Sequence, residues 1–385
     1  MHNLPTFFLT FTLAIGQTDA EWQISTTDGV QTSATLPAFD FSKLIALRRL
    51  DKAVPEWPTE PHAILANGDR IVGTLTSADA RSITIENRYL GKINIPLTAL
   101  SAIWNKTLPA GTPLDPMKSD WLGDRKTDAI LFSNRDIQRG TIERIGDDSA
   151  VWLKQAGGMS RKFDAEKIVA VGFSAGLSRM RTPKIAHAAI VLADGSRITI
   201  DAIVAYKKSL GIGTVTGGKG EIPESALISL DVLEGKAVYL ADIKPKSSKT
   251  EPALGLIWPL VNNRSAKGNP LRIGSNAGIQ TFERGIGTHA RSTVEYDLAG
   301  KYRRFEAVVG MDATTGLRGR VGIRILLDGK PQAIAGLADL RAELGQIPFS
   351  IDTTNVKTLT LITDMGPLGD VNADVNWCNA RLIRN

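Results

Sequence analysis

The stretch ERGIGTHARSTVEYDLAGKYRRFEAVVGMD, residues 283–312, decides the fold of the C-terminal third of the chain. It predicts β-strands at Ser292–Leu298 and Tyr302–Gly310, because apolar and polar residues alternate there between turn residues. Three later stretches predict further strands: RVGIRILLDGK (320–330), VKTLTLITDMG (356–366) and VNWCNARLIRN (375–385). About eight strands are expected in a domain of this length, so we predict a two-sheet sandwich of the jelly-roll type. Within this third of the chain, GLADLRAEL (336–344) suggests a helix of two turns.

These strands carry motifs that resemble a known family. Residues Gly285–Ser292 read G-I-G-T-H-A-x-S, and a Y-D-L strand and K-Y-x-x-F-x-A-x-V-G-x-D follow, ending at Asp312. Then come, in order, I-L-L-D-G-K (325–330), L-x-L-x-x-D (359–364) and W-x-x-A-R-L (377–382). In these motifs residues 251–385 are similar to the NPCBM/NEW2 family, which is related to carbohydrate-binding module family 51 and is found appended to glycoside hydrolases, including family 98. The resemblance implies a jelly-roll sandwich and a galactose-like glycan as ligand.

A sugar site in a binding module needs an apolar platform and a few planar hydrogen-bonding groups. The C-terminal domain offers six candidates for these roles: His289, Arg318, Asp374, Asn376, Trp377 and Asn379. Structural alternatives stay open for three of them. The His289 ring could be satisfied by backbone bonds, Trp377 could fill the core, and Arg318 could be a solvated loop cation.

The chain departs from the family pattern beside its last strand. Family members commonly show Asp-His-x-Asp-Trp, whereas this chain has an amide, Asn376, before Trp377. The departure puts sugar or calcium contact by that loop in question. Hard cations take loop carboxylates, so a structural calcium is one open interpretation, although no EF-hand spacing is present. Its candidate ligands are Asp312, Asp364, Asp370 and Asp374. No other cofactor is expected.

One pattern recurs three times upstream, at residues 63–105, 129–175 and 189–242. Each copy opens with an apolar strand and a polar turn: Asn67-Gly68, Asn134-Arg135 and Asp194-Gly195. Further short strands follow at about ten-residue spacing, so we predict about three small β-barrel or meander repeat modules. Residues 21–62 hold a possible partial module, in which LIALRRL (44–50) suggests a connecting helix.

Amino-acid composition predicts the boundaries of the segments that join or precede these domains. Residues 106–128 connect two modules, and IKPKSSKTEP (243–252) predicts an exposed linker before a sandwich at 253–385. Residues 1–20 resemble a secretory signal cut after Ala20, with a buried strand or an uncleaved anchor as the alternatives. No later segment offers about 18 consecutive apolar residues. We therefore expect a secreted or periplasmic protein without a membrane span after signal removal.

Composition also argues against several classes of protein. The net charge is only +6, from 46 basic and 40 acidic residues, which is weak evidence against a nucleic-acid partner. The single cysteine, Cys378, allows no intrachain disulfide, and the four histidines lack metal-ligand spacing. There is no GxSxG elbow, and no scaffold is evident that would hold the two carboxylates of a glycosidase. The sequence thus predicts a protein that is not an enzyme.

Together these observations predict an exported carbohydrate-binding protein whose C-terminal sandwich binds a galactose-type glycan, on a polysaccharide or a glycoprotein. The upstream β modules would serve as spacers or as protein-contact units. Two alternatives remain. The sandwich has lost sugar binding and the protein is a scaffold, or the protein is an accessory subunit that targets a separate glycoside hydrolase.

Overall fold

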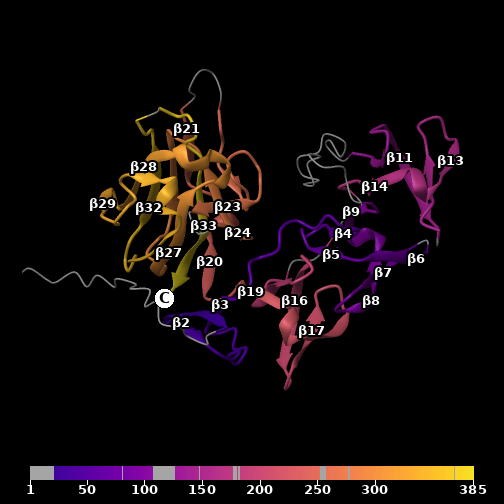
Figure 1. The fold of residues 1–385 in the computed structure, drawn as a ribbon, viewed down its shortest axis with the longest axis horizontal. Coiled ribbons are helices and arrows are strands. Elements are labelled where there is room, and N and C mark those ends of the chain that lie inside the picture. The colour runs from indigo at the N-terminus through magenta and orange to yellow at the C-terminus, as the bar shows by residue number, and fades with distance from the viewer. Residues whose placement is uncertain are drawn as a thin grey trace, which may run out of the picture.

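The computed structural model describes residues 21–79, 81–106, 126–146, 148–176, 180, 183–251, 257–275, 278–367 and 369–385. Within these ranges the chain forms 33 strands and six short 3-10 turns and no α-helix, so the predicted all-β class is confirmed. No helix there is long and apolar enough to cross a membrane. The proposed signal, residues 1–20, and most of the proposed connector 106–128 lie outside the described residues. Figure 1 shows two parts, a C-terminal sandwich and a strand-rich N-terminal part.

The N-terminal part contains nineteen strands. Sixteen of them join in one sheet, and β6 (Thr74–Ala78), β7 (Ser82–Asn87) and β8 (Gly91–Pro96) form a separate sheet. The first three strands of the chain lie at one end of the large sheet: β1 (Trp22–Thr26), β2 (Gly29–Ser33) and β3 (Leu44–Arg49).

Three consecutive segments have a similar order of elements, except that the first has six strands and the other two have five each. The first continues with β4 (His62–Leu65), β5 (Arg70–Val72), β6 to β8, η1 (Leu97–Ala99) and β9 (Leu100–Trp104). The second has β10 (Asp128–Phe132), β11 (Ile137–Ile145), β12 (Val151–Lys154), β13 (Ser160–Phe163), η2 (Ala165–Lys167) and β14 (Ile168–Gly172). The third has β15 (His187–Leu192), β16 (Arg197–Ala205), β17 (Ser209–Thr214), β18 (Lys219–Pro223), η3 (Glu224–Ala226) and β19 (Leu227–Leu233).

In each segment the opening strand lies between the strand that follows it and the closing strand. The polar turn after each opening strand is closed by an equivalent backbone bond: Leu65 N to Asp69 O, Phe132 N to Asp136 O, and Leu192 N to Ser196 O. The segments are not separate barrels, however. β14 pairs with β9 and β5 pairs with β16, so strands of all three segments share one sheet and one apolar core.

The helix expected at residues 44–50 is wrong, because Leu44–Arg49 is strand β3. It pairs with β1 on one side and with β19 on the other, and its first four residues are buried. A strand buried on both faces reads as a continuous apolar run, which periodicity cannot distinguish from a short helix. Arg48 and Arg49 follow that run, and Arg48 forms an ion pair with Asp231 of β19 at 2.6 Å.

The C-terminal part is a sandwich of two six-stranded antiparallel sheets. One contains β20 (Ala237–Tyr239), β22 (Val261–Asn262), β25 (Gly285–Thr288), β27 (Tyr302–Met311), β31 (Ile347–Asp352) and β33 (Val375–Arg384). The other contains β21 (Ser247–Thr250), β26 (Ser292–Asp297), β28 (Arg320–Leu327), β29 (Lys330–Gln332), β30 (Leu340–Arg341) and β32 (Thr358–Asp364). The turns are η4 (Leu240–Asp242), η5 (Ala313–Arg318) and η6 (Ala342–Leu344). A hairpin of β23 (Leu271–Ser275) and β24 (Gly278–Phe282) packs apolar residues against Cys378 of β33.

Two expectations for this part need correction. The two helical turns expected at 336–344 are instead β30 and the single turn η6, which ends at Gly345 with a φ of +63°. The exposed linker expected at 243–252 contributes strand β21, which pairs with β26, and β20 before it pairs with β33. Polar residues in a strand at the edge of a sheet have the same composition as a linker, which is why the sequence was misleading here. Because β20 and β21 both pair with strands of the sandwich, the sandwich begins near residue 237 rather than at 253.

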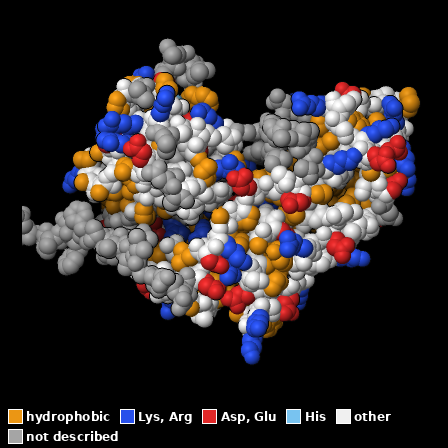
Figure 2. All heavy atoms as spheres, viewed as in Figure 1, with side chains coloured by type: hydrophobic (Ala, Val, Ile, Leu, Met, Phe, Trp, Pro, Cys, Tyr) orange, Lys and Arg blue, Asp and Glu red, His pale blue; other side chains and the backbone are white. Residues whose placement is uncertain are grey.

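A buried carboxylate of the N-terminal part accepts a hydrogen bond from the sandwich. Asp231 of β19 is buried, and it accepts a 2.5 Å hydrogen bond from the Tyr239 hydroxyl at the start of the sandwich as well as the Arg48 ion pair. Burial, and then the adjacent Asp231 charge, raise the pKa of Tyr239 to about 12. The rest of the charge is dispersed, and Figure 2 shows basic and acidic side chains interspersed over the visible face.

Candidate functional site

Two of the predicted site residues meet at one end of the sandwich. β25 and β33 are paired so that Thr288 lies opposite Val375, and the residues just beyond this pair are His289 and Asp374. His289 Nδ1 lies 2.9 Å from Asp374 Oδ1, and both side chains are more than nine-tenths buried. The structure therefore brings His289 and Asp374 into direct hydrogen-bond contact.

Asp374 also receives a cation from the loop before β23. Lys267 Nζ lies 2.6 Å from Asp374 Oδ2, and the Lys267 side chain is about one-third exposed. Burial alone would raise the pKa of Asp374, but hydrogen bonds from His289 and Lys267 outweigh it and hold the pKa below its ordinary value. The carboxylate is therefore an acceptor, so His289 Nδ1 donates to it and Nε2 is directed away from Asp374.

An aromatic side chain that we did not predict completes the cluster. The Trp258 ring is half-buried, and its centroid lies 5.7 Å from that of His289 at an interplanar angle of 43°. A partly exposed indole supplies an apolar surface beside hydrogen-bonding groups, which is the combination that a sugar ring requires. Neither residue stands out in the sequence, because only tertiary folding brings Trp258 to His289 and Lys267 to Asp374.

Trp377 lies in the core and not at this site. It is fully buried in the core between the two sheets, and its indole N–H donates to Thr288 Oγ1 at 3.1 Å. Such a ring presents no face to a ligand, so the alternative that Trp377 fills the core is correct, and its interpretation as a sugar contact is wrong.

Asn376 is fully buried beneath the β23–β24 hairpin. Its Nδ2 donates to Asp312 Oδ2 at 2.8 Å and to the carbonyl oxygen of Arg272 at 2.9 Å. Asp312 is itself buried and accepts from the backbone N–H of Thr314 at 2.9 Å. An amide can donate to both acceptors whereas a carboxylate cannot, so these hydrogen bonds favour asparagine over aspartate at position 376.

The other two sugar candidates are not among the hydrogen-bond or ion-pair partners of His289 and Asp374. Asn379 has a positive φ of +50° at an irregularity in β33, and its side-chain oxygen accepts a 3.4 Å bond from Arg48 of the N-terminal sheet. Arg318 is exposed at the end of η5. Asn379 therefore belongs to the junction between the two parts.

The four calcium candidates do not form one cluster. Asp364 is held in a bidentate ion pair with Arg324 at 2.6 and 2.9 Å, and Asp370 lies in a turn. The backbone N–H of Asp312 donates to the Asp374 carbonyl oxygen at 2.9 Å. The described part of the chain contains no group of three or more His, Cys, Asp or Glu that could hold a metal ion.

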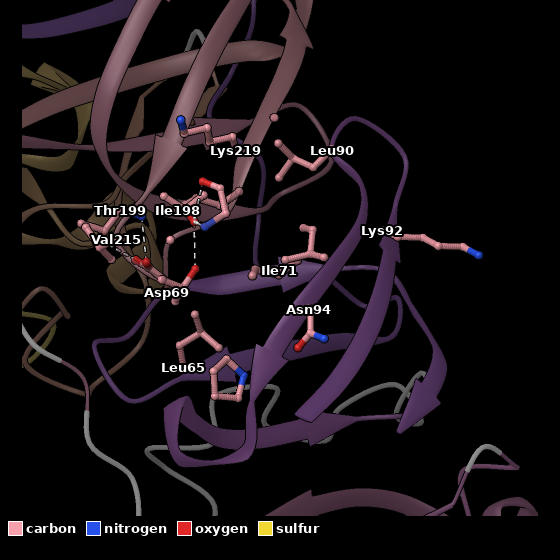
Figure 3. A pocket seen from close by; sticks show the side chains of 17 residues that line it. Leu65, Asp69, Ile71, Leu90, Lys92, Asn94, Ile198, Thr199, Val215 and Lys219 are labelled. Atoms are coloured by element: carbon pink, nitrogen blue, oxygen red, sulfur yellow. Dashed lines mark hydrogen bonds between the residues drawn. The ribbon is translucent and has the colours of Figure 1, made fainter. Parts of the chain in front are cut away.

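The N-terminal part contains a separate cavity of about 340 Å³, lined by residues of β8, β18 and the turn before β18 (Figure 3). Its lining is mainly aliphatic and threonine side chains, with Lys92 and Lys219 among the polar residues. Asp69 already accepts bonds from the Thr199 backbone and hydroxyl, at 2.7 and 2.8 Å. None of the described residues that line this cavity is aromatic, so it offers a sugar no ring to stack on.

Comparison with known proteins identifies the sandwich. The NPCBM/NEW2 domain model matches residues 236–383. A Renibacterium salmoninarum protein named "Putative endo-alpha-N-acetylgalactosaminidase" is 23% identical over 193 residues, which are 50% of this chain and 12% of that protein. The chain therefore spans only a small part of the length of this relative.

Two solved structures from Clostridium perfringens are also similar. The CBM51 from GH95, in complex with methyl-galactose, is 25% identical, with a TM-score of 0.34, and the match covers 38% of this chain and 99% of that one. The CBM51-2 and INT domains of ZmpB, in complex with GlcNAc, are 20% identical, with a TM-score of 0.35, covering 51% of this chain and 43% of that one. The family match therefore falls on the sandwich, since residues 236–383 run from just before β20 into β33.

Proposed function

We propose that the chain is an exported, non-catalytic protein that binds a galactose-type glycan at the cluster of Trp258, His289, Asp374 and Lys267. The observation that carries the proposal is the His289–Asp374 hydrogen bond of 2.9 Å beside the half-buried Trp258 ring. The carboxylate orients the imidazole, so its Nε2 can bond a sugar hydroxyl while the indole covers an apolar face of the pyranose.

The same geometry supports binding rather than hydrolysis. A glycosidase needs two carboxyl groups about 5 to 9.5 Å apart, one of them free to exchange a proton. Asp374 is occupied by His289 and Lys267, and Asp312 by Asn376 and Thr314. Both carboxylates have structural partners, so we assign them to holding the site.

Calorimetric titration of the full chain with methyl-galactose and N-acetylgalactosamine tests this function. We expect saturable binding, which Trp258→Ala and His289→Ala each weaken at least tenfold. Asp364→Asn is the matched control, because it removes an exposed ion pair of the opposite sheet, and it should bind as the unaltered chain does. Equal affinity in all four proteins would contradict the site, and no binding of either sugar would contradict the function.

A second proposal concerns the N-terminal part, which we infer to contact an extended, acidic segment of a partner protein. Within the described residues β8 pairs only with β7, and β18 only with β17, so each has an open edge beside the 340 Å³ cavity. Open strand edges accept an added strand through main-chain hydrogen bonds, and Lys92 and Lys219 favour acidic side chains.

A nine-residue peptide of alternating valine and glutamate is a suitable probe for this surface. We expect it to shift the NMR signals of residues 91–96 and 219–223, and an N-methylated version, which lacks main-chain donors, to leave them unchanged. Identical shifts with both peptides, or shifts confined to other residues, would contradict strand addition.

A further inference from the structure

The loop that carries Lys267 is itself tightly built. Ser265 closes it through two bonds, from the Gly268 N–H to its carbonyl at 2.7 Å and from its own N–H to the Asn269 carbonyl at 2.9 Å. Gly287 of β25 lies directly against the loop, where a Cβ atom would approach the Arg264 carbonyl oxygen to 2.4 Å. The loop therefore rests on the strand that leads to His289.

Both ends of this loop contact the N-terminal part of the chain. Before it, the Arg264 guanidinium lies 5.0 Å from the centroid of the Trp57 ring. After it, Arg272 Nη2 lies 3.0 Å from Glu56 Oε2, while the Arg272 carbonyl accepts the bond from Asn376. Residues 264–272 are therefore held between the segment around Trp57 and strand β33 of the sandwich.

A buried ion pair strengthens the same contact. Glu283, which follows β24, lies 2.7 Å from Arg70 of β5 and 3.8 Å from Arg197 of β16. Burial alone would raise the pKa of Glu283, but the charges of Arg70, Arg197 and Arg264 lower it below the ordinary value. The Arg70 guanidinium also lies 4.7 Å from the Trp57 ring centroid, so one cluster joins the two contacts.

We infer that the N-terminal sheet is a positioning element of the ligand site, which holds the Lys267 loop against Asp374 through Glu283, Arg272 and Arg264. This inference rests on the proposed function for its effect on affinity. The sandwich and the N-terminal sheet then form one binding unit, and the upstream strands do more than space the module from its neighbours. Positioning residues of this kind contact no ligand and act on affinity through the loop.

Glu283→Gln in the full chain tests the inference by two readouts, with Asp364→Asn as the control away from the contact. We expect faster amide hydrogen exchange in residues 263–272 and at least fivefold weaker binding of methyl-galactose, with both quantities unchanged in the control. The double variant Glu56→Arg with Arg272→Glu reverses an ion pair that is partly exposed, and it should restore most of the affinity that Arg272→Glu loses.

The two readouts separate this inference from the proposed function. Unchanged exchange in Glu283→Gln overturns the inference, and so does faster exchange with unaltered affinity. If the unaltered chain binds neither methyl-galactose nor N-acetylgalactosamine, the proposed function fails, and the exchange readout still decides whether the sheet holds the loop. If Glu283→Gln fails to fold, the charge-reversal pair decides, and absence of rescue counts against the inference.

Discussion

Replacing Asn376 by aspartate tests why this chain has an amide at this buried position. Asn376 is fully buried, and its Nδ2 donates to Asp312 Oδ2 at 2.8 Å and to the Arg272 carbonyl at 2.9 Å. Asn376→Asp removes both donors and sets a second carboxyl group against Asp312. Losing a hydrogen bond to a charged acceptor costs about 1.5–3 kcal/mol, and an uncompensated buried charge brings the total to about 3–5 kcal/mol at pH 7.

The pH dependence gives the prediction its sign. Burial and the neighbouring Asp312 raise the pKa of the introduced carboxyl in the folded state above its unfolded value of about 3.9. The folded variant then binds more protons than the unfolded chain, so its stability falls as pH rises from about 4, by at most about 1.4 kcal/mol per unit. At pH 4 the protonated acid can donate to Asp312 again, and the loss should shrink to about 1–2 kcal/mol.

Hydrogen exchange of the β33 amides, measured by mass spectrometry in urea at pH 4 and pH 7, reports the free energy of opening at this strand. The quantity to compare is the difference between the variant and the unaltered chain at each pH, because it cancels the other titrating groups. A difference that is equal at both pH values, or below 1 kcal/mol at pH 7, would refute the assigned role of Asn376.

Three further predictions concern buried groups elsewhere. Burial lowers the pKa of His62 to about 4 in the folded protein. As the pH falls below 6.5, His62 is therefore protonated in the unfolded chain before it is protonated in the folded one. The free energy of unfolding then falls by about 3 kcal/mol between pH 6.5 and 4. Urea titrations should show that His62→Gln flattens this fall, and an unchanged slope would count against it. Asp231→Asn weakens the ion pair with Arg48 and the hydrogen bond from Tyr239, so it should lower the free energy of unfolding by about 3–5 kcal/mol in the same assay. A decrease below 1 kcal/mol would contradict the role of Asp231. Trp377→Ala should destabilise the sandwich by about 3–5 kcal/mol, seen by circular dichroism on heating, whereas an unaltered melt would place the ring outside the core.

The sequence was sufficient for the all-β class, the sandwich and the NPCBM/NEW2 resemblance, because alternation and turn residues are local signals. It was misleading where a buried strand reads like a helix, as at Leu44–Arg49, and where a polar edge strand reads like a linker, as at Ser247–Thr250. Local pattern does not record how many neighbours a strand acquires in a sheet.

Of the four residues of the proposed site, sequence reasoning named His289 and Asp374 as candidates but not Trp258 and Lys267. Trp258 precedes β22 and Lys267 follows it, so only the folded sandwich brings Trp258 to His289 and Lys267 to Asp374. In the sequence, Trp377 is as plausible a sugar-stacking residue as Trp258. In the folded protein, however, the alternation of side chains along β33 directs the Trp377 ring into the core. Which face a strand residue occupies is settled by register, and register depends on the partner strands.

Fluorine NMR of the full chain labelled with 5-fluorotryptophan tests the central claim most directly. The chain has seven tryptophans, and Trp258→Phe assigns the signal that belongs to the site. During titration with methyl-galactose we predict a saturable shift of the Trp258 signal, while the buried Trp377 signal stays in place. An unmoved Trp258 signal at saturating sugar, or a shift confined to another tryptophan, would contradict a ligand site at Trp258, His289 and Asp374.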